Sequence, residues 1–238
     1  MVALKVGWSS VEDEFPDVKL DFYGAPGRHM ADIVVSEGRL LSSSDFLRQQ
    51  LKGTSGGSSE IKNCYDWYLV CGLGLNIFNA VRVYNRYRAE THVRESCTPV
   101  SDDCFLQAVI GCAREMLSIE ILKKLRKITD APVRVIAVPF LGRENKTNVH
   151  HLLKIKDADS VATFFRLACD QLAAEHNARF LPQPKQTLRK RVLLTRSAYT
   201  QDAVRFSEAI TDGIHMNADY GAIVLRQALV AHQCEAIS

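Results

Sequence analysis

The sequence lacks the features that would assign it to a specialised class of protein. No apolar stretch approaches the roughly 20 residues that a membrane-spanning helix needs, and none of the seven cysteines forms a Cys-x-x-Cys pair of the kind that binds zinc. Neither sign of charge dominates, since 30 basic residues face 27 acidic ones, which argues against a nucleic-acid partner. Glu12, Asp13 and Glu14 lie where a secretory signal would keep its apolar segment. These absences predict a cytoplasmic protein with no metal, no cofactor and no contact with nucleic acid or membrane.

The composition is that of a globular chain with a substantial core. Apolar residues make up 47% of the 238 positions and charged residues 24%, which excludes a disordered or collagen-like chain. The length favours one domain over two. No repeat and no long linker divides the sequence, so we expect a single domain spanning residues 1–238.

Short apolar strands alternate with amphipathic helices along the chain. This alternation predicts an α/β fold, with a mostly parallel sheet and helices on both faces. Residues 79–101 read as irregular. We expect strands at Val18–Tyr23, 67–73, 133–140 and 179–181, a shorter one at 33–35, and helices at 2–15, 45–52, 103–128, 158–176 and 218–233.

The strongest candidate for chemistry lies just before the last predicted helix. Asp212 and His215 are three residues apart in a loop, so both side chains can face one site. There the carboxylate can orient the imidazole, and the imidazole can act as a general base. The alternative is that Asp212 is a turn residue and His215 a surface histidine.

The string D-G-I-H-M-N that contains these two residues, followed by an apolar helix, closely resembles the last sequence block of the SGNH (GDSL-like) hydrolases. The resemblance implies a flavodoxin-like, three-layer α/β/α fold and the hydrolysis of acyl esters. It also implies that Asp212 and His215 complete a Ser-His-Asp triad.

The same resemblance implies where the oxyanion donors lie. In the family, a glycine follows the second strand, and here Gly27 is the first choice and Gly24 the second. A later G-x-N-D block supplies an asparagine, and Gly74-Leu75-Asn76 matches it, although Ile77 stands where aspartate is usual. The crevice beyond the carboxyl ends of the strands is where such groups should meet. Each has a simpler alternative, as a turn glycine or a turn-forming asparagine.

The family's first block, a strand followed by G-D-S, has no counterpart in this sequence. The chain begins inside the helix that should follow it, so the first strand and the nucleophilic serine are expected to be missing together. The sequence leaves open an N-terminal truncation and a natural pseudo-enzyme. A missing strand would expose a sheet edge and allow self-association. Other serines weighed as nucleophiles lack the required context, namely Ser9, Ser10, Ser55 and Ser160.

The sequence therefore predicts an SGNH-like ester hydrolase. Its substrate would be a small-molecule or saccharide ester, for example an acetylated sugar, and its serine is not identifiable. The alternative function is a catalytically silent binding or interaction module on the same α/β frame.

Overall fold

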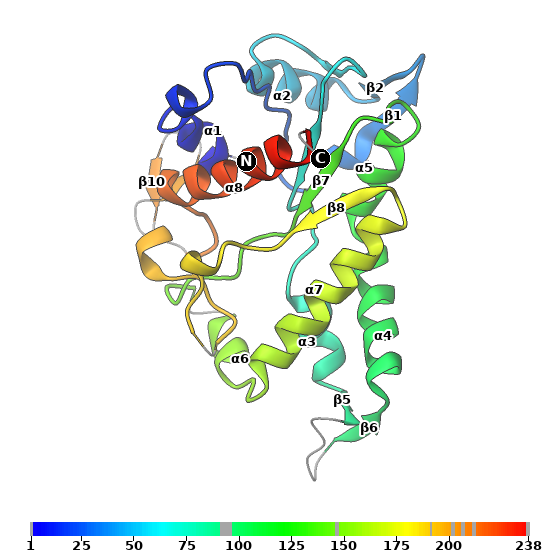
Figure 1. Ribbon diagram of the computed structural model, residues 1–238, viewed down its shortest axis with the longest axis vertical. Helices are drawn as coiled ribbons and strands as arrows, with labels where there is room; N and C mark the ends of the chain where they lie inside the picture. The colour runs from blue at the N-terminus through cyan, green and yellow to red at the C-terminus, as the bar shows by residue number, and fades with distance from the viewer. Residues whose placement is uncertain are drawn as a thin grey trace.

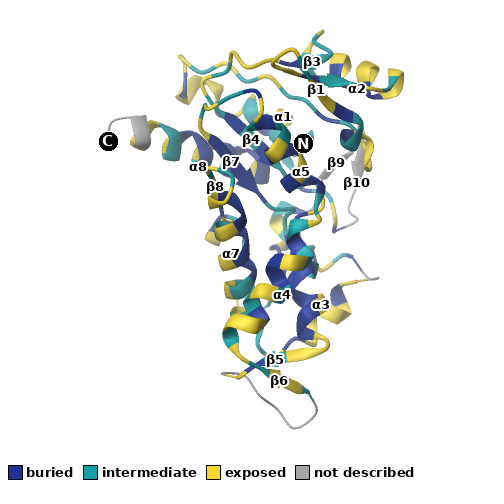
Figure 2. Cartoon of the chain, turned by 90° about the vertical axis from the view of Figure 1, so that its right-hand side faces the viewer, coloured by how far each residue is buried: buried dark blue, intermediate teal, exposed yellow. Residues whose placement is uncertain are grey.

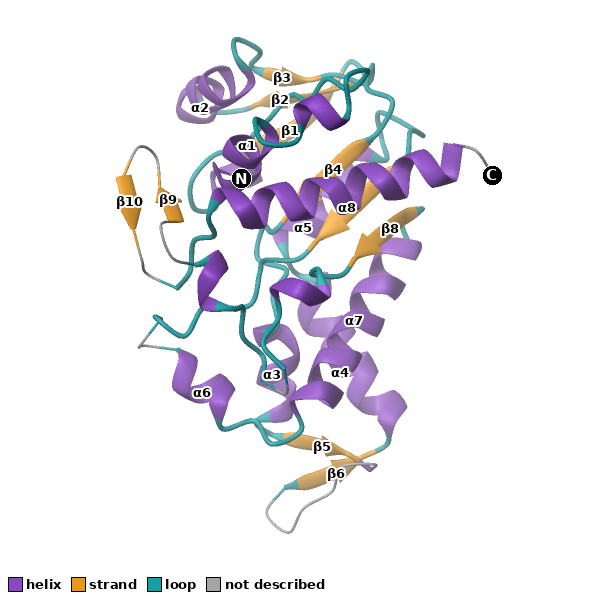
Figure 3. Ribbon diagram, turned by 60° about the vertical axis from the view of Figure 1, so that its left-hand side comes forward, coloured by secondary structure: helices purple, strands orange, loops and turns teal. Residues whose placement is uncertain are grey.

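The computed structural model describes residues 2–90, 97–145, 148–190, 192–200, 203–205, 208–210 and 213–236 (Figure 1). Its framework is a parallel sheet of three strands, in the order β4-β7-β8 (Figure 3). These strands are β4 (Tyr68–Cys71), β7 (Val133–Ile136) and β8 (Ala178–Leu181). All four residues of β7, including Arg134, are buried, as expected for a central strand. The fold is thus mixed α/β with a parallel sheet.

Two groups of helices accompany this sheet. The first group contains α1 (Val2–Trp8) and α8 (Ala218–Ala236), which pack along each other, while α5 (Leu117–Leu125) contacts β4 and the strand at residues 33–36. The second contains α3 (Phe78–Tyr84), α4 (Asp102–Arg114) and α7 (Ala158–Ala174), which pack against one another and present buried faces to their neighbours (Figure 2). The Ser101 hydroxyl caps α4 by accepting the Cys104 N–H.

Smaller elements complete the described chain. An antiparallel sheet joins β1 (Ile33–Ser36), β2 (Arg39–Ser42) and β3 (Glu60–Ile61), with α2 (Asp45–Ser55) between the last two. Two further strand pairs are β5 (Tyr87–Ala89) with β6 (Thr98–Val100), which are parallel, and β9 (Ala203–Arg205) with β10 (Glu208–Ile210), which are antiparallel. A short helix, α6 (Val149–Leu153), precedes α7. No described helix has the length and apolar character needed to cross a membrane.

Several sequence-based expectations for the elements were wrong. The helix expected over 2–15 ends at Trp8, and the strand expected over 133–140 ends at Ile136. Val18–Tyr23 is not a strand, because no neighbouring strand pairs with it among the described residues. The helix expected over 103–128 is two helices, α4 and α5, interrupted at Glu115 and Met116. The region 79–101, read as irregular, holds most of α3 together with β5 and β6. The β1-β2-β3 hairpins make the antiparallel content larger than expected.

One residue of the central strand is charged. Arg134 of β7 is 1% exposed, and its Nη1 lies 3.3 Å from Nδ1 of His232 in α8. Its guanidinium carbon lies 5.6 Å from the ring centroid of Trp67, which itself stacks on His232. This cluster connects the sheet to the second half of α8.

Two glycines allow α1 and α8 to approach closely. A Cβ added at Gly221 would overlap the carbonyl of Ala3, and one added at Gly7 would overlap the backbone of Ala222. Backbone atoms cannot rotate away as a side chain can. The packing of α1 on α8 therefore requires glycine at both positions.

We predict that Gly221→Ala lowers the free energy of unfolding by about 3 kcal/mol, because the methyl group forces α1 away from α8. Gly111→Ala is the matched control, since Gly111 also lies in a helix but has no atom within 4 Å of its Cβ position. The control should gain about 0.5–1 kcal/mol from helix propensity. Urea unfolding measures both variants, and equal stability of the two would contradict the prediction.

Candidate functional site

The turn that follows β4 holds the first candidate, Asn76. Gly72, Leu73 and Gly74 have φ values of 74°, 51° and 84°, so this turn runs through three left-handed residues. A bulky residue such as leucine rarely adopts this conformation, and the strain costs about 1–3 kcal/mol. The Leu73 carbonyl accepts the Ser118 N–H of α5 at 3.0 Å, which helps to hold the turn in this form.

The Asn76 side chain forms hydrogen bonds with residues two positions before and after it in the chain. Its Nδ2 donates to the Gly74 carbonyl, and its Oδ1 accepts the Phe78 N–H at the start of α3, both at 3.0 Å. Asn76 therefore acts as the turn former that the simpler interpretation predicted. Because an amide nitrogen carries two hydrogens, this contact leaves one of them for another acceptor.

The loop after β7, residues 137–145, brings the two candidate segments to one end of the sheet. The Val138 N–H donates to the Leu75 carbonyl, next to Asn76, at 2.7 Å. Further along, the Gly142 N–H donates to the Gly213 carbonyl, also at 2.7 Å. A Cβ at Gly213 would overlap the backbone nitrogen of Asn145, and its φ of 67° also favours glycine. Gly213 thus lets the segment that carries His215 lie against this loop.

His215 is half-buried in this segment, two residues after the Gly142–Gly213 contact. Asn217 fixes the end of the segment: its Oδ1 accepts the Tyr220 N–H in the first turn of α8, and its Nδ2 donates to the Ala198 carbonyl at 2.8 Å. Asp212, the predicted partner of His215, lies outside the described residues.

A carboxylate with hydroxyl donors lies beside the same loop. The Thr200 hydroxyl donates to Oε2 of Glu144 at 2.8 Å. Burial raises the pKa of Glu144, but hydrogen bonds from Ser197 and Thr200 outweigh this effect, so the pKa falls below its ordinary value of 4.5. Glu144 is consequently an anion at neutral pH, and it anchors the Ser197–Thr200 turn to the loop after β7.

A second group of hydrogen bonds holds the first half of the loop after β7. The Gln183 amide oxygen accepts the Phe140 N–H at 2.9 Å, and its Nε2 donates to Thr187 and Thr195. The Thr195 hydroxyl in turn donates to the Phe140 carbonyl. The loop is therefore held along its length by buried hydrogen bonds.

The two glycines proposed as oxyanion donors lie elsewhere in the fold. The Gly24 N–H faces the Thr54 hydroxyl at 3.2 Å, near the end of α2. Gly27 is exposed, with a φ of 58° and no atom within 4 Å of its Cβ position. Among the described residues, no hydrogen bond joins either glycine to Asn76 or His215. One loop thus contacts both the Asn76 turn and the His215 segment, through Leu75 and Gly213, whereas within the described chain these two glycines contact neither.

The four serines considered as nucleophiles lie in helices or in the turn that follows a helix. Ser55 is the last residue of α2, and its hydroxyl donates to the Ser58 carbonyl at 2.7 Å. Ser160 lies in the first turn of α7, while Ser9 and Ser10 belong to the turn after α1. None of these four follows a strand, as a nucleophile elbow would.

Sequence reasoning did not find Glu144, Ser197 and Thr200. Glu144 lies more than fifty residues from the other two in the sequence, and the three belong to no motif, so no sequence signal marked them. Only Asn217 carried a readable signal, as a helix N-cap residue three positions before Tyr220. In the part of the chain that is described, no group of three or more His, Cys, Asp or Glu residues is arranged to hold a metal ion.

Comparisons of this chain with protein-family models, with curated proteins and with solved structures found no match.

The depressed pKa of Glu144 predicts a pH dependence of stability. Because the pKa is lower in the folded state, the carboxylate stabilises the fold above its unfolded pKa, and this stabilisation is lost as the pH falls below about 4.5 and through the folded value. We expect Glu144→Gln to lower the free energy of unfolding at pH 7 by about 1–2 kcal/mol. The difference from wild type should shrink at pH 3.5.

Urea unfolding at the two pH values tests this expectation. Glu12→Gln serves as the control, since Glu12 is an exposed carboxylate in the turn before Pro16. A Glu144→Gln deficit that stays equal at both pH values would contradict the assigned role of the carboxylate.

Proposed function

We propose that this chain carries the base and oxyanion parts of an SGNH-type ester hydrolase. His215 is the general base, Asp212 orients it, and Asn76 donates to the oxyanion. The substrate class is small acyl esters, including acetylated saccharides. The main observation in support is the pair of backbone hydrogen bonds, Val138 to Leu75 and Gly142 to Gly213, at the carboxyl end of β7.

The proposed chemistry follows from these groups. His215 takes the proton of an attacking hydroxyl as its oxygen forms a bond to the ester carbonyl carbon. The negative charge that develops on the carbonyl oxygen is stabilised by the remaining Asn76 N–H. The bond to the leaving alcohol then breaks, and His215 returns the proton to that oxygen.

The finer fold assignment belongs to the same proposal. We infer a flavodoxin-like arrangement of three layers, in which the β4-β7-β8 sheet is the central layer. A position for ligands beyond the carboxyl ends of parallel strands agrees with the general rule for open α/β sheets. Cytoplasmic location and self-association through a sheet edge stay predictions of the sequence.

A catalytically silent binding module is the second candidate function. Two observations favour it. The Asn76 amide already forms hydrogen bonds within its own turn, and none of the four serines follows a strand. The two candidates differ in whether His215 and the free Asn76 N–H contribute to turnover.

The first test is hydrolysis of p-nitrophenyl acetate. We expect His215→Ala to reduce turnover at least about 100-fold, because a positioned base contributes roughly 10²–10⁴-fold. His150→Ala should leave turnover unchanged, since His150 is an exposed residue of α6. Equal rates for wild type and His215→Ala would favour the binding module.

The second test separates the structural and catalytic roles of Asn76. In Asn76→Asp the Oδ1 acceptor for the Phe78 N–H is kept, but both side-chain N–H donors are lost, including the one bonded to the Gly74 carbonyl, so the free energy of unfolding should fall by about 1 kcal/mol. We expect turnover to fall, because the loss of one oxyanion donor removes about 2.7–4 kcal/mol of transition-state stabilisation. Asn76→Ala should lose both stability and turnover. Full activity of Asn76→Asp would show that the residue only forms the turn.

A further inference from the structure

A cavity of about 550 Å3 lies between β4 and the segment of residues 17–25. Its volume is within the range of ligand-binding pockets, about 300–1,000 Å3. Residues of α1, α5 and α8 close its sides, while Asn76 and His215 are not among its lining residues. The cavity is therefore separate from the candidate ester-hydrolase site.

One wall of the cavity is an unpaired strand edge. The N–H groups of Tyr68 and Gly72 donate to Pro132 and Ile136, on the β7 side, at 2.9 and 2.7 Å. Backbone groups alternate in direction along a strand, so those of Leu69 and Cys71 point away from β7. Leu69 and Cys71 both line the cavity. Among the described strands, β4 pairs with β7 alone.

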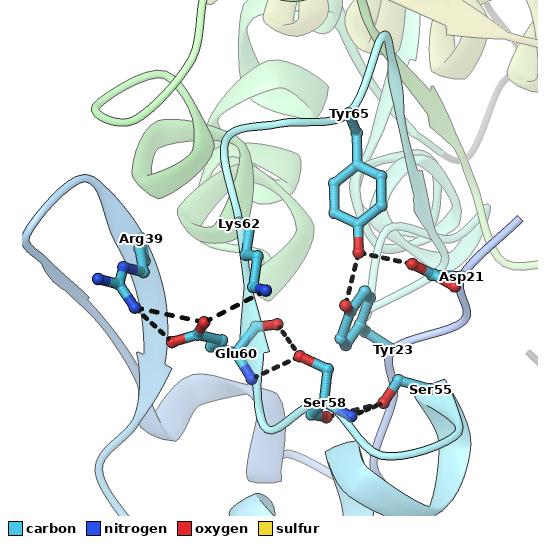
Figure 4. A network of polar contacts seen from close by, with 8 residues as sticks. All are labelled: Asp21, Tyr23, Arg39, Ser55, Ser58, Glu60, Lys62 and Tyr65. Carbon is cyan, nitrogen blue, oxygen red and sulfur yellow. Dashed lines mark hydrogen bonds and ion pairs between the residues drawn. The ribbon is translucent and has the colours of Figure 1, made fainter.

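The opposite wall, residues 17–25, does not pair with the backbone groups of Leu69 and Cys71. Within the described residues, no backbone hydrogen bond joins residues 17–25 to β4. Side chains hold the segment instead: the Tyr65 hydroxyl donates to Asp21 at 2.7 Å and lies 2.6 Å from the Tyr23 hydroxyl (Figure 4). The segment of residues 17–25 thus lies opposite the open edge of β4 without pairing with it.

The chemistry of the lining indicates what fits there. The Leu69 and Cys71 N–H groups have no backbone partner in the described part of the chain, and the Leu69 carbonyl has a weak contact from the Cys71 thiol at 3.9 Å. An extended peptide backbone can supply hydrogen-bond partners to such an edge. Most of the remaining lining is apolar, with Leu20, Phe22 and Leu73 among its residues. Its charged side chains are predominantly acidic, namely Asp17, Asp21 and Asp66 against Lys19.

We propose that this cavity binds an extended segment of another protein, which adds to the sheet as a strand beside β4. The segment carries apolar side chains that face the apolar lining and lysine or arginine side chains that pair with the aspartates of the lining. Its backbone pairs with the N–H and C=O groups of Leu69 and Cys71.

The test uses a fluorescent eight-residue peptide with lysine at both ends and six alternating valine and leucine residues between them. Binding to the full chain is followed by fluorescence anisotropy. We expect saturable binding at one peptide per chain. A peptide of the same length with glutamate ends should bind at least tenfold more weakly, and Asp21→Asn should narrow this difference.

Amide hydrogen exchange measured by NMR locates the pairing. The Leu69 and Cys71 amides should exchange at least tenfold more slowly when the peptide is bound. The Tyr68 amide serves as the internal control, because it already donates to Pro132 and should not change.

Protein and peptide variants test the backbone contact itself. Leu69→Pro removes the N–H that faces the cavity, and proline is tolerated on strand edges, whereas Leu69→Ala keeps that N–H. We expect Leu69→Pro to bind at least tenfold more weakly than Leu69→Ala. If Leu69→Pro does not fold, the lysine peptide methylated on all its backbone nitrogens replaces this comparison and should lose binding to wild type.

Three results would overturn the proposal. They are equal binding of the methylated and unmethylated peptides, unchanged exchange of the Leu69 and Cys71 amides, and a chain that sedimentation shows to be a dimer that excludes the peptide. The last result would assign the edge to a second copy of this chain. None of these readouts depends on ester hydrolysis.

Discussion

Within the described residues, β4 pairs with β7 and has no strand on its other side, and this constraint determines the other features. Parallel register, with Tyr68 opposite Val133 and Cys71 opposite Ile136, makes both strands end at the same edge. The turn that carries Asn76 and the loop that contacts Gly213 are therefore neighbours. The same one-sided pairing leaves the Leu69 and Cys71 backbone groups facing a cavity. One strand thus contributes both to the candidate active site at its end and to a binding edge along its side.

Glycines determine how closely the other elements approach this framework. Gly7 and Gly221 bring α1 and α8 into backbone contact, and Gly142 and Gly213 bring the His215 segment onto the loop after β7. At Gly7, Gly213 and Gly221 a side chain would meet backbone atoms, which have little freedom to move, and at Gly142 it would meet the Glu144 and Thr200 side chains. The candidate site is consequently positioned by main-chain contacts. Its side chains, such as Asn76 and Glu144, serve first to hold the loops in place.

The cavity and the candidate site adjoin one another in the chain. Cys71 and Leu73 line the cavity, and Asn76 follows within a few residues through the turn of positive φ values. Burial raises the pKa of the Cys71 thiol to about 11, so this residue stays protonated and acts as part of an apolar wall. A strand bound beside β4 would contact the start of this turn.

Local patterns in the sequence determined the α/β class, the buried strands β4, β7 and β8, and most helices, because periodicity and capping act over a few residues. They also marked Asn76, Asp212 and His215 as candidates. Only the tertiary structure decided that Val18–Tyr23 has no strand partner, that Gly24 and Gly27 lie apart from Asn76, and that Glu144 meets Thr200. The reason is that pairing, close approach and burial depend on residues distant in the chain, whose positions are set by packing of the whole molecule and not by any local pattern.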